Sequence, residues 1–183
     1  MNRFLRFKLQ HLGCLVIGVF GLVVVYIYLL PVDKSSPSLF VNTSTSVPLG
    51  LYHMTKVSDL KRGDVIRLCL PEALNRFAIK RGYLRQGVCP GGATRVGKPV
   101  IALHGDTVVV TEKAVQINGS DMLEVPVSMH DRRGRCLANA IGIHILAPDE
   151  CFLISTHHQL SYDSRYYGPV PCGGPPYYIL TKR

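Results

Sequence analysis

The hydrophobic pattern divides the chain into an apolar N-terminal segment and a longer part with short apolar runs. Residues 12–30 carry no charge, whereas residues 1–11 contain Arg3, Arg6 and Lys8 and no acidic residue. An uncharged run of this length can span a bilayer. Because basic flanks stay on the cytoplasmic side, we predict a cytoplasmic N-terminus over 1–11 and a single transmembrane anchor over 12–30 in the inner membrane.

A cleavable signal peptide is the competing interpretation of this segment, because it also has a basic start and an apolar core. The apolar run is longer than a usual signal-peptide core, and Leu30-Pro31-Val32-Asp33 offers no small-x-small cleavage site. We therefore expect an uncleaved anchor. Residues 31–41 contain Pro, Ser and charges, which predicts a linker, and residues 42–183 are expected to form a periplasmic domain.

Beyond the linker, short runs of β-branched and other apolar residues are separated by turn residues, which predicts strands. Residues 71–84 differ, because they begin with proline and place apolar residues near helical spacing, as in an amphipathic helix. The predicted strands are 64–69, 100–103, 107–111, 115–117, 143–146 and 151–155, with a hairpin turn at Asn118-Gly119. This pattern predicts a mainly β domain, a barrel or sheet with one or two short helices.

Composition and charge narrow the function. A chain of 183 residues with 47% hydrophobic residues can form one domain with a real core. Its 21 Lys and Arg exceed its 12 Asp and Glu, but these basic residues are scattered along the sequence, with no aromatic-interleaved basic run. We therefore expect no nucleic-acid partner. A basic face near anionic lipid of the inner membrane is favoured.

The cysteines indicate disulfides more than a metal site. Cys14 lies in the apolar segment, and none of the other five belongs to a Cys-x-x-Cys motif or has the Cys and His spacing of a zinc site. The sequence therefore predicts neither a metal nor a cofactor. If the domain is exported, Cys69 and Cys89 are the first pair expected to form a disulfide, and the remaining connectivity stays open.

A serine-rich turn after the anchor is the first candidate for chemistry. Residues 42–52 read Asn-Thr-Ser-Thr-Ser-Val-Pro-Leu-Gly-Leu-Tyr, in which Pro48 and Gly50 favour a turn that holds the hydroxyls in a fixed orientation. A serine hydroxyl needs a base to become a nucleophile. There is no Gly-x-Ser-x-Gly elbow, and His157-His158 lie among polar loop residues, so a Ser-His-Asp triad is disfavoured.

Lysine can act as the base if it is neutral, and burial lowers a lysine pKa by up to about 3 to 5 units. Lys98 fits best, because it precedes the apolar run 100–103 and is flanked by Gly97 and Pro99 rather than by charges. The alternative is a strand-start lysine facing water, since lysine is rarely buried.

Three motifs together resemble the type I signal peptidases. The first is Ser46-Val47-Pro48, the second runs from Lys98 to Gly105-Asp106, and the third, 161–168, reads Ser-Tyr-Asp-Ser-Arg-Tyr-Tyr-Gly. The form Ser-x-Pro-x-Gly-Leu-Tyr is most similar to the conjugal transfer signal peptidases of the TraF kind. The general family usually has two residues between the serine and the proline, an arginine after the lysine and Pro-Gly-Asp where this chain has His104-Gly105-Asp106; His104 receives no catalytic role.

The resemblance implies a catalytic pair, with Ser46 as nucleophile and Lys98 as general base, and it groups Asp163 with the catalytic residues. The remaining family positions would stabilise the oxyanion beside the Ser46 amide, orient the lysine and brace the site: Ser44, Ser161 and, paired with Asp163, Arg165.

The function implied is a membrane-anchored Ser/Lys endopeptidase that processes a conjugative pilin precursor, or another exported precursor, in conjugal transfer and type IV secretion. Water as acceptor gives cleavage, and the substrate's own amine gives a cyclic product; the residues leave this choice open. Two alternatives are a housekeeping signal peptidase with many substrates and a non-catalytic anchored β-domain of a secretion channel.

Overall fold

The computed structural model divides the chain into two units, residues 1–36 and 37–183. It describes residues 19, 21, 38–173 and 177–182. Apart from Val19 and Gly21, the predicted anchor over 12–30 lies outside the described residues. In the part of the chain that is described, no helix combines the length and the apolar character needed to cross a membrane.

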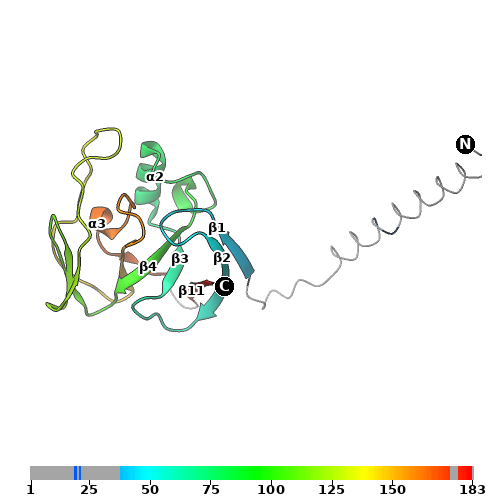
Figure 1. Ribbon diagram of the computed structural model, residues 1–183, viewed down its shortest axis with the longest axis horizontal. Coiled ribbons are helices and arrows are strands. Elements are labelled where there is room, and N and C mark those ends of the chain that lie inside the picture. The colour runs from blue at the N-terminus through cyan, green and yellow to red at the C-terminus, as the bar shows by residue number, and fades with distance from the viewer. Residues whose placement is uncertain (1–18, 20, 22–37, 174–176, 183) are drawn as a thin grey trace, which may run out of the picture. The chain divides into compact units, whose positions relative to one another are not determined.

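The second unit is built from two open antiparallel sheets and two short α-helices (Figure 1), so the predicted mainly β class is confirmed. The larger sheet has the strand order β1-β2-β11-β3-β4-β9-β10. Its strands are β1 Ser38–Asn42, β2 Gly50–Val57, β3 Val65–Leu68, β4 Val96–Ala102, β9 Glu150–Leu153, β10 Val170–Pro171 and β11 Tyr177–Lys182. The strand β1 thus begins inside the segment 31–41 that was expected to be a linker.

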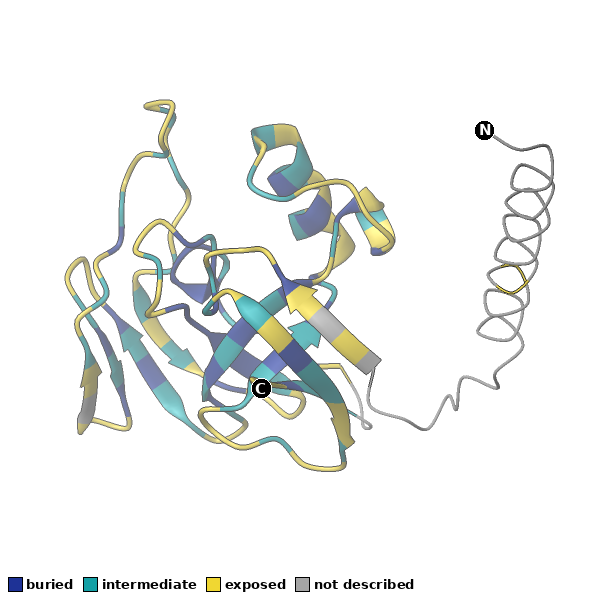
Figure 2. Ribbon diagram, turned by 45° about the vertical axis from the view of Figure 1, so that its right-hand side comes forward, coloured by how far each residue is buried: buried dark blue, intermediate teal, exposed yellow. Residues whose placement is uncertain are grey.

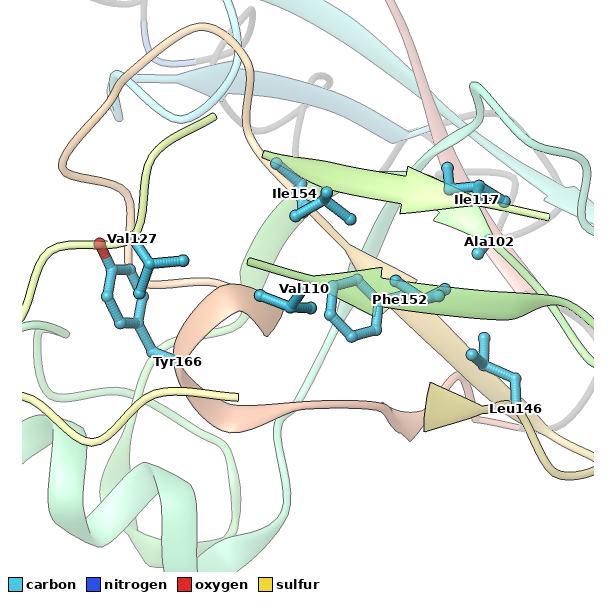
Figure 3. Close-up of a cluster of buried hydrophobic side chains, with 10 residues drawn as sticks. Ala102, Val110, Ile117, Val127, Leu146, Phe152, Ile154 and Tyr166 are labelled. Carbon is cyan, nitrogen blue, oxygen red and sulfur yellow. The ribbon is translucent and has the colours of Figure 1, made fainter. Parts of the chain in front are cut away.

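The smaller sheet has the order β7-β6-β5-β8. Its strands are β5 Thr107–Val110, β6 Val115–Ile117, β7 Asp121–Leu123 and β8 Gly142–Ile145. The hairpin turn between β6 and β7 is confirmed, because Asn118 and Gly119 both have positive φ (52° and 75°). A buried cluster that includes Val110, Ile117 and Phe152 joins this sheet to β9 (Figure 3).

One helix is shorter than predicted, and another was not predicted. The predicted helix over 71–84 is observed as α2 Glu72–Arg81. It ends early because Gly82 adopts φ 75° and its N–H bonds back to the last turn. A short 3-10 turn, η1, follows at Pro90–Gly92. The helix α3 Ser164–Tyr167 was not predicted, since four residues are too few to show a helical period.

Strand β4 places the candidate base inside the domain. It begins four residues before the predicted strand 100–103. The prediction started too late because Gly97 and Pro99 resemble strand breakers in the sequence. Side chains alternate between the two faces of a strand, which Figure 2 shows as alternating bands of burial. Val96, Lys98 and Val100 share the buried face. Lys98 therefore occupies a core position and does not start the strand in water.

The predicted Cys69–Cys89 disulfide is confirmed, and it closes a loop that contains α2. A second disulfide, Cys151–Cys172, links β9 to the residue after β10. Cys136 is exposed and has a free thiol.

Replacing Cys69 and Cys89 together with serine is expected to lower the free energy of unfolding by about 3 kcal/mol, because the bond closes a loop of this size and spans 20 residues. Urea unfolding of oxidised protein measures the change. Cys136→Ser is the control and should unfold at the wild-type urea concentration. Equal stability of the double variant and the control would contradict the expectation.

Candidate active site

A cleft of about 800 Å³ contains the candidate nucleophile and base. Ser46 comes from the turn between β1 and β2, Lys98 from β4, and Ser161 from the loop before α3. Three segments that are far apart in the sequence therefore meet in one place. The structure brings together one member of each of the three motifs identified in the sequence.

The turn that carries Ser46 is held by hydrogen bonds to Asn42, a residue to which no role was assigned from the sequence. Asn42 is 5% exposed. Its Nδ2 donates to the carbonyl oxygens of Ser44 and Val47 at 2.8 and 2.9 Å, and its Oδ1 accepts from the backbone N–H and the hydroxyl of Ser44. Tyr52 Oη donates to Pro48 O at 2.7 Å. These bonds fix the backbone on both sides of Ser46.

The three side chains form a short hydrogen-bonded chain. Lys98 Nζ lies 2.7 Å from Ser46 Oγ and is also hydrogen-bonded to Ser161 Oγ. The two hydroxyl oxygens are 3.5 Å apart. A neutral amine at this distance can accept the Ser46 proton, since proton transfer needs hydrogen-bond contact. Ser161 restricts where the amine can point.

Burial favours the neutral form of the Lys98 amine near physiological pH. The side chain is only 4% exposed. Desolvation lowers the pKa of Lys98 from 10.5 to about 8, an effect that the Asp163 carboxylate opposes and the Arg165 guanidinium reinforces. The amine is therefore far more often deprotonated than a lysine in water.

Asp163 and Arg165 form a fully buried ion pair behind the lysine. Arg165 Nε and Nη2 donate to the two carboxylate oxygens at 2.8 and 2.9 Å. Arg165 Nη1 also donates to Pro126 O at 2.8 Å. Neither Asp163 nor Arg165 is hydrogen-bonded to Ser46 or Lys98 in the described structure. The pair braces the loop that carries Ser161, because Arg165 Nη2 also donates to Ser161 O at 3.3 Å. Removing one partner of such a pair is strongly destabilising.

Ser155 connects this brace to the nucleophile, and no sequence signal indicated it. Its backbone N–H donates to Asp163 Oδ2 at 3.2 Å, and its hydroxyl donates to the Ser46 carbonyl oxygen at 2.5 Å. Ser155 is 1% exposed. The position of Ser46 is therefore set by Asn42 from its own turn and by Ser155 from the segment that follows β9.

Two other predicted positions have different surroundings. Ser44 lines the cleft, but its hydroxyl donates to Asn42 Oδ1 at 3.0 Å. Asp106 accepts hydrogen bonds from Arg62, Asn118 and the Leu103 backbone. The Gly-Asp end of the second motif thus stabilises the turn between β4 and β5, while its lysine enters the cleft.

No group of three His, Cys, Asp or Glu side chains is placed to hold a metal ion among the residues that the structure describes. The groups in hydrogen-bond contact at Ser46 are the Ser46 and Ser161 hydroxyls and the Lys98 amine. Together they are suited to nucleophilic attack on a carbonyl carbon.

Comparison with known proteins points to one family. A profile for the family described as signal peptidase, peptidase S26, matches residues 5–173. The chain is 39% identical over 136 residues to the conjugal transfer protein TraF of Agrobacterium fabrum (strain C58 / ATCC 33970), covering 73% of this chain and 76% of that protein. It is 33% identical over 132 residues to a plasmid transfer protein TraF of Escherichia coli, covering 71% and 74%.

Proposed function

We propose that this chain, which belongs to the signal peptidase family, peptidase S26, as a TraF-like member, is a serine endopeptidase. In this proposal Ser46 is the nucleophile and Lys98 is the general base. The observation that carries this proposal is the 2.7 Å distance between Lys98 Nζ and Ser46 Oγ at a buried position. Ser161 orients the lysine by its hydrogen bond to the same nitrogen.

The reaction begins when neutral Lys98 takes the Ser46 proton as Oγ attacks the carbonyl carbon of a peptide bond. The resulting oxyanion is held by the Ser46 backbone N–H and by the Ser44 hydroxyl, which must rotate away from Asn42 to reach it. The C–N bond then breaks, and the Lys98 ammonium returns the proton to the leaving amine. The product of this stage is an ester between the substrate and Ser46.

The ester is resolved by a second nucleophile. Water yields a cleaved protein, and an amine at the other end of the same substrate yields a cyclic protein. In either case the attacking group loses a proton to Lys98, and Ser46 Oγ regains one as the ester bond breaks.

The proposed substrate is a pilin precursor, because the similar proteins are named for conjugal and plasmid transfer. We further propose that residues 12–30 anchor the protein in the inner membrane with residues 1–11 in the cytoplasm, and that 42–183 act in the periplasm. An anchored site would meet the cleavage region of an inserted precursor at the outer surface of that membrane.

Mass spectrometry of the pilin from cells that carry the transfer system tests this proposal. Cells with wild-type protein should yield a processed pilin, and its mass distinguishes open from joined ends. Cells with Ser46→Ala should accumulate the precursor, while other exported proteins are processed normally. Normal pilin processing by Ser46→Ala would overturn the proposed function, and a general failure of export processing would indicate a housekeeping enzyme instead.

The pH dependence of kcat/KM should report Lys98. Since the reaction requires the neutral amine, kcat/KM is expected to rise about tenfold per pH unit in acid and to level off above its pKa of about 8. Initial rates at low substrate concentration measure the profile. A midpoint near 10.5 would mean that the amine is solvated, and a flat profile would mean that another group is the base.

A further inference from the structure

The cleft that holds Ser46 is strongly basic. Six arginines line it, and Asp131 is the only acidic residue among the described residues that do so. The cleft therefore has an excess of five positive charges before Lys98 is counted, more than half of the chain's net charge of +9. The arginines are Arg81, Arg85, Arg95, Arg132, Arg133 and Arg135. Basic residues that are scattered in the sequence are thus concentrated by the fold.

These arginines come from two regions beside the catalytic residues. Arg81 ends α2, and Arg85 and Arg95 lie between α2 and the start of β4. The other three belong to the loop 130–136, which projects on the same side of the molecule as α2 (Figure 1). An isolated antiparallel β-bridge between the backbones of His130 and Cys136 closes this loop.

The carboxylate of Asp131, the one acidic group among the described residues that line the cleft, is already paired. Asp131 pairs with Arg135 at 2.6 Å and accepts a hydrogen bond from the Tyr83 hydroxyl at 2.7 Å. These bonds, led by that from Arg135, hold the pKa of Asp131 well below its usual range. The Arg135 guanidinium also donates to Arg81 O. Asp131 thus ties the loop to the end of α2, and its charge is already used by Arg135 and Arg81.

Four of the arginines, Arg85, Arg95, Arg132 and Arg133, are exposed and form no ion pair with a carboxylate among the described residues. An exposed arginine presents a planar fork of donors that matches a carboxylate group. A cleft lined by one sign of charge also concentrates ligands of the opposite sign. These four side chains can therefore select what enters the cleft.

We infer that the cleft recognises an acidic peptide segment, so that a good substrate carries Asp or Glu side chains beside the bond attacked by Ser46. This inference rests on the proposed function. A peptide is favoured over a nucleic acid because Ser46 and Lys98 lie in the same cleft as the arginines, so a chain bound there exposes its backbone carbonyls to the nucleophile.

The test uses the full chain in a neutral detergent and quenched fluorescent peptide libraries. All libraries share randomised central residues and differ only in flanking residues, which are Glu, Gln or Lys. We expect kcat/KM to be about tenfold higher for the Glu library than for the Gln library and lowest for the Lys library, with the differences shrinking as salt screens the charges. Equal rates for the three libraries would overturn the inference.

Charge reversal tests the named residues. Arg132→Glu combined with Arg133→Glu should lower the ratio of Glu-library to Lys-library kcat/KM at least tenfold. Lys61→Glu combined with Lys113→Glu is the matched control, because it makes the same charge change at exposed positions outside the cleft, and its ratio should equal that of wild type. If the control shifts the ratio as much as the cleft variant, overall charge is responsible and the assignment to the cleft is wrong.

Binding separates this inference from the proposed function. Fluorescence anisotropy with Ser46→Ala protein measures the Kd of each library without cleavage. Tighter binding of the Glu library with no cleavage by wild type would support the acidic-peptide site and overturn the peptidase. Cleavage by wild type with equal Kd values for the libraries would support the peptidase and overturn the acidic-peptide site. A single-stranded DNA oligonucleotide that displaces the Glu library and binds more tightly would overturn the assignment to a peptide.

Discussion

Replacing Ser46 with alanine is expected to lower kcat/KM roughly 10⁴-fold to 10⁶-fold, the loss found when a nucleophile that works with a paired base is removed. The reason is that no other described hydroxyl can take its place without rearrangement. Ser161 Oγ also contacts Lys98, but it lies 3.5 Å behind Ser46 Oγ and is buried at 4% exposure. Cleavage of a peptide or pilin precursor by purified full-length protein measures the loss.

Ser58→Ala is the control for the Ser46 variant, because it removes an exposed hydroxyl in the turn between β2 and β3. Its kcat/KM should match wild type. Thermal unfolding shows whether Ser46→Ala is folded, and we expect little change in Tm, since Asn42 and Ser155 hold the turn through backbone groups that alanine retains. Activity of a folded Ser46→Ala protein close to wild type would eliminate Ser46 as the nucleophile.

Replacing Lys98 with methionine should abolish activity and stabilise the fold. At about pH 7, a pKa lowered to about 8 means that the folded protein bears a cost of about 3 kcal/mol for the ionised amine. Methionine has a similar length and no charge, but it loses the hydrogen bonds to Ser46 and Ser161. The net increase in the free energy of unfolding is therefore expected to be about 1 to 3 kcal/mol.

The pH dependence of stability checks the sign of this effect. The folded-state pKa lies below the unfolded value of 10.5, so the unfolded chain binds more protons between about pH 8 and 10.5. Wild-type stability should rise with pH through this window relative to Lys98→Met, and the advantage of the variant should shrink. Urea unfolding at several pH values measures both proteins.

Lys98→Arg keeps the positive charge but cannot be deprotonated in this pH range. It should be inactive and less stable than wild type, because it places a larger permanent cation at a buried position. An active Lys98→Arg protein would show that the residue contributes only charge and not proton transfer.

The sequence predicted the elements whose signals are local. The mainly β class, the hairpin turn at Asn118-Gly119 and the Cys69–Cys89 disulfide are all confirmed. The family resemblance inferred from three short motifs is confirmed as well. Each of these predictions rests on residue types and spacings that can be read directly from short stretches of sequence.

The contacts that complete the site were not predictable in the same way. Ser155 is one serine among many until the segment after β9 places its hydroxyl against the Ser46 carbonyl oxygen. The start of β4 was misplaced because Gly97 and Pro99 weaken a strand in isolation, and pairing with β3 overrides that preference. Asn42 did carry a usable signal, because asparagine often bonds to backbone groups of the turn that follows it.

The place of β11 in the larger sheet connects the two parts of the chain that supply Ser46 and Lys98. β11 is the last of the described strands, yet it lies between β2, which follows the Ser46 turn, and β3, which pairs with the Lys98 strand β4 (Figure 1). Within the described sheet, the hydrogen bond between the nucleophile and its base thus depends on a strand that supplies neither residue. A change that detaches β11 is expected to separate Ser46 from Lys98 without touching either side chain.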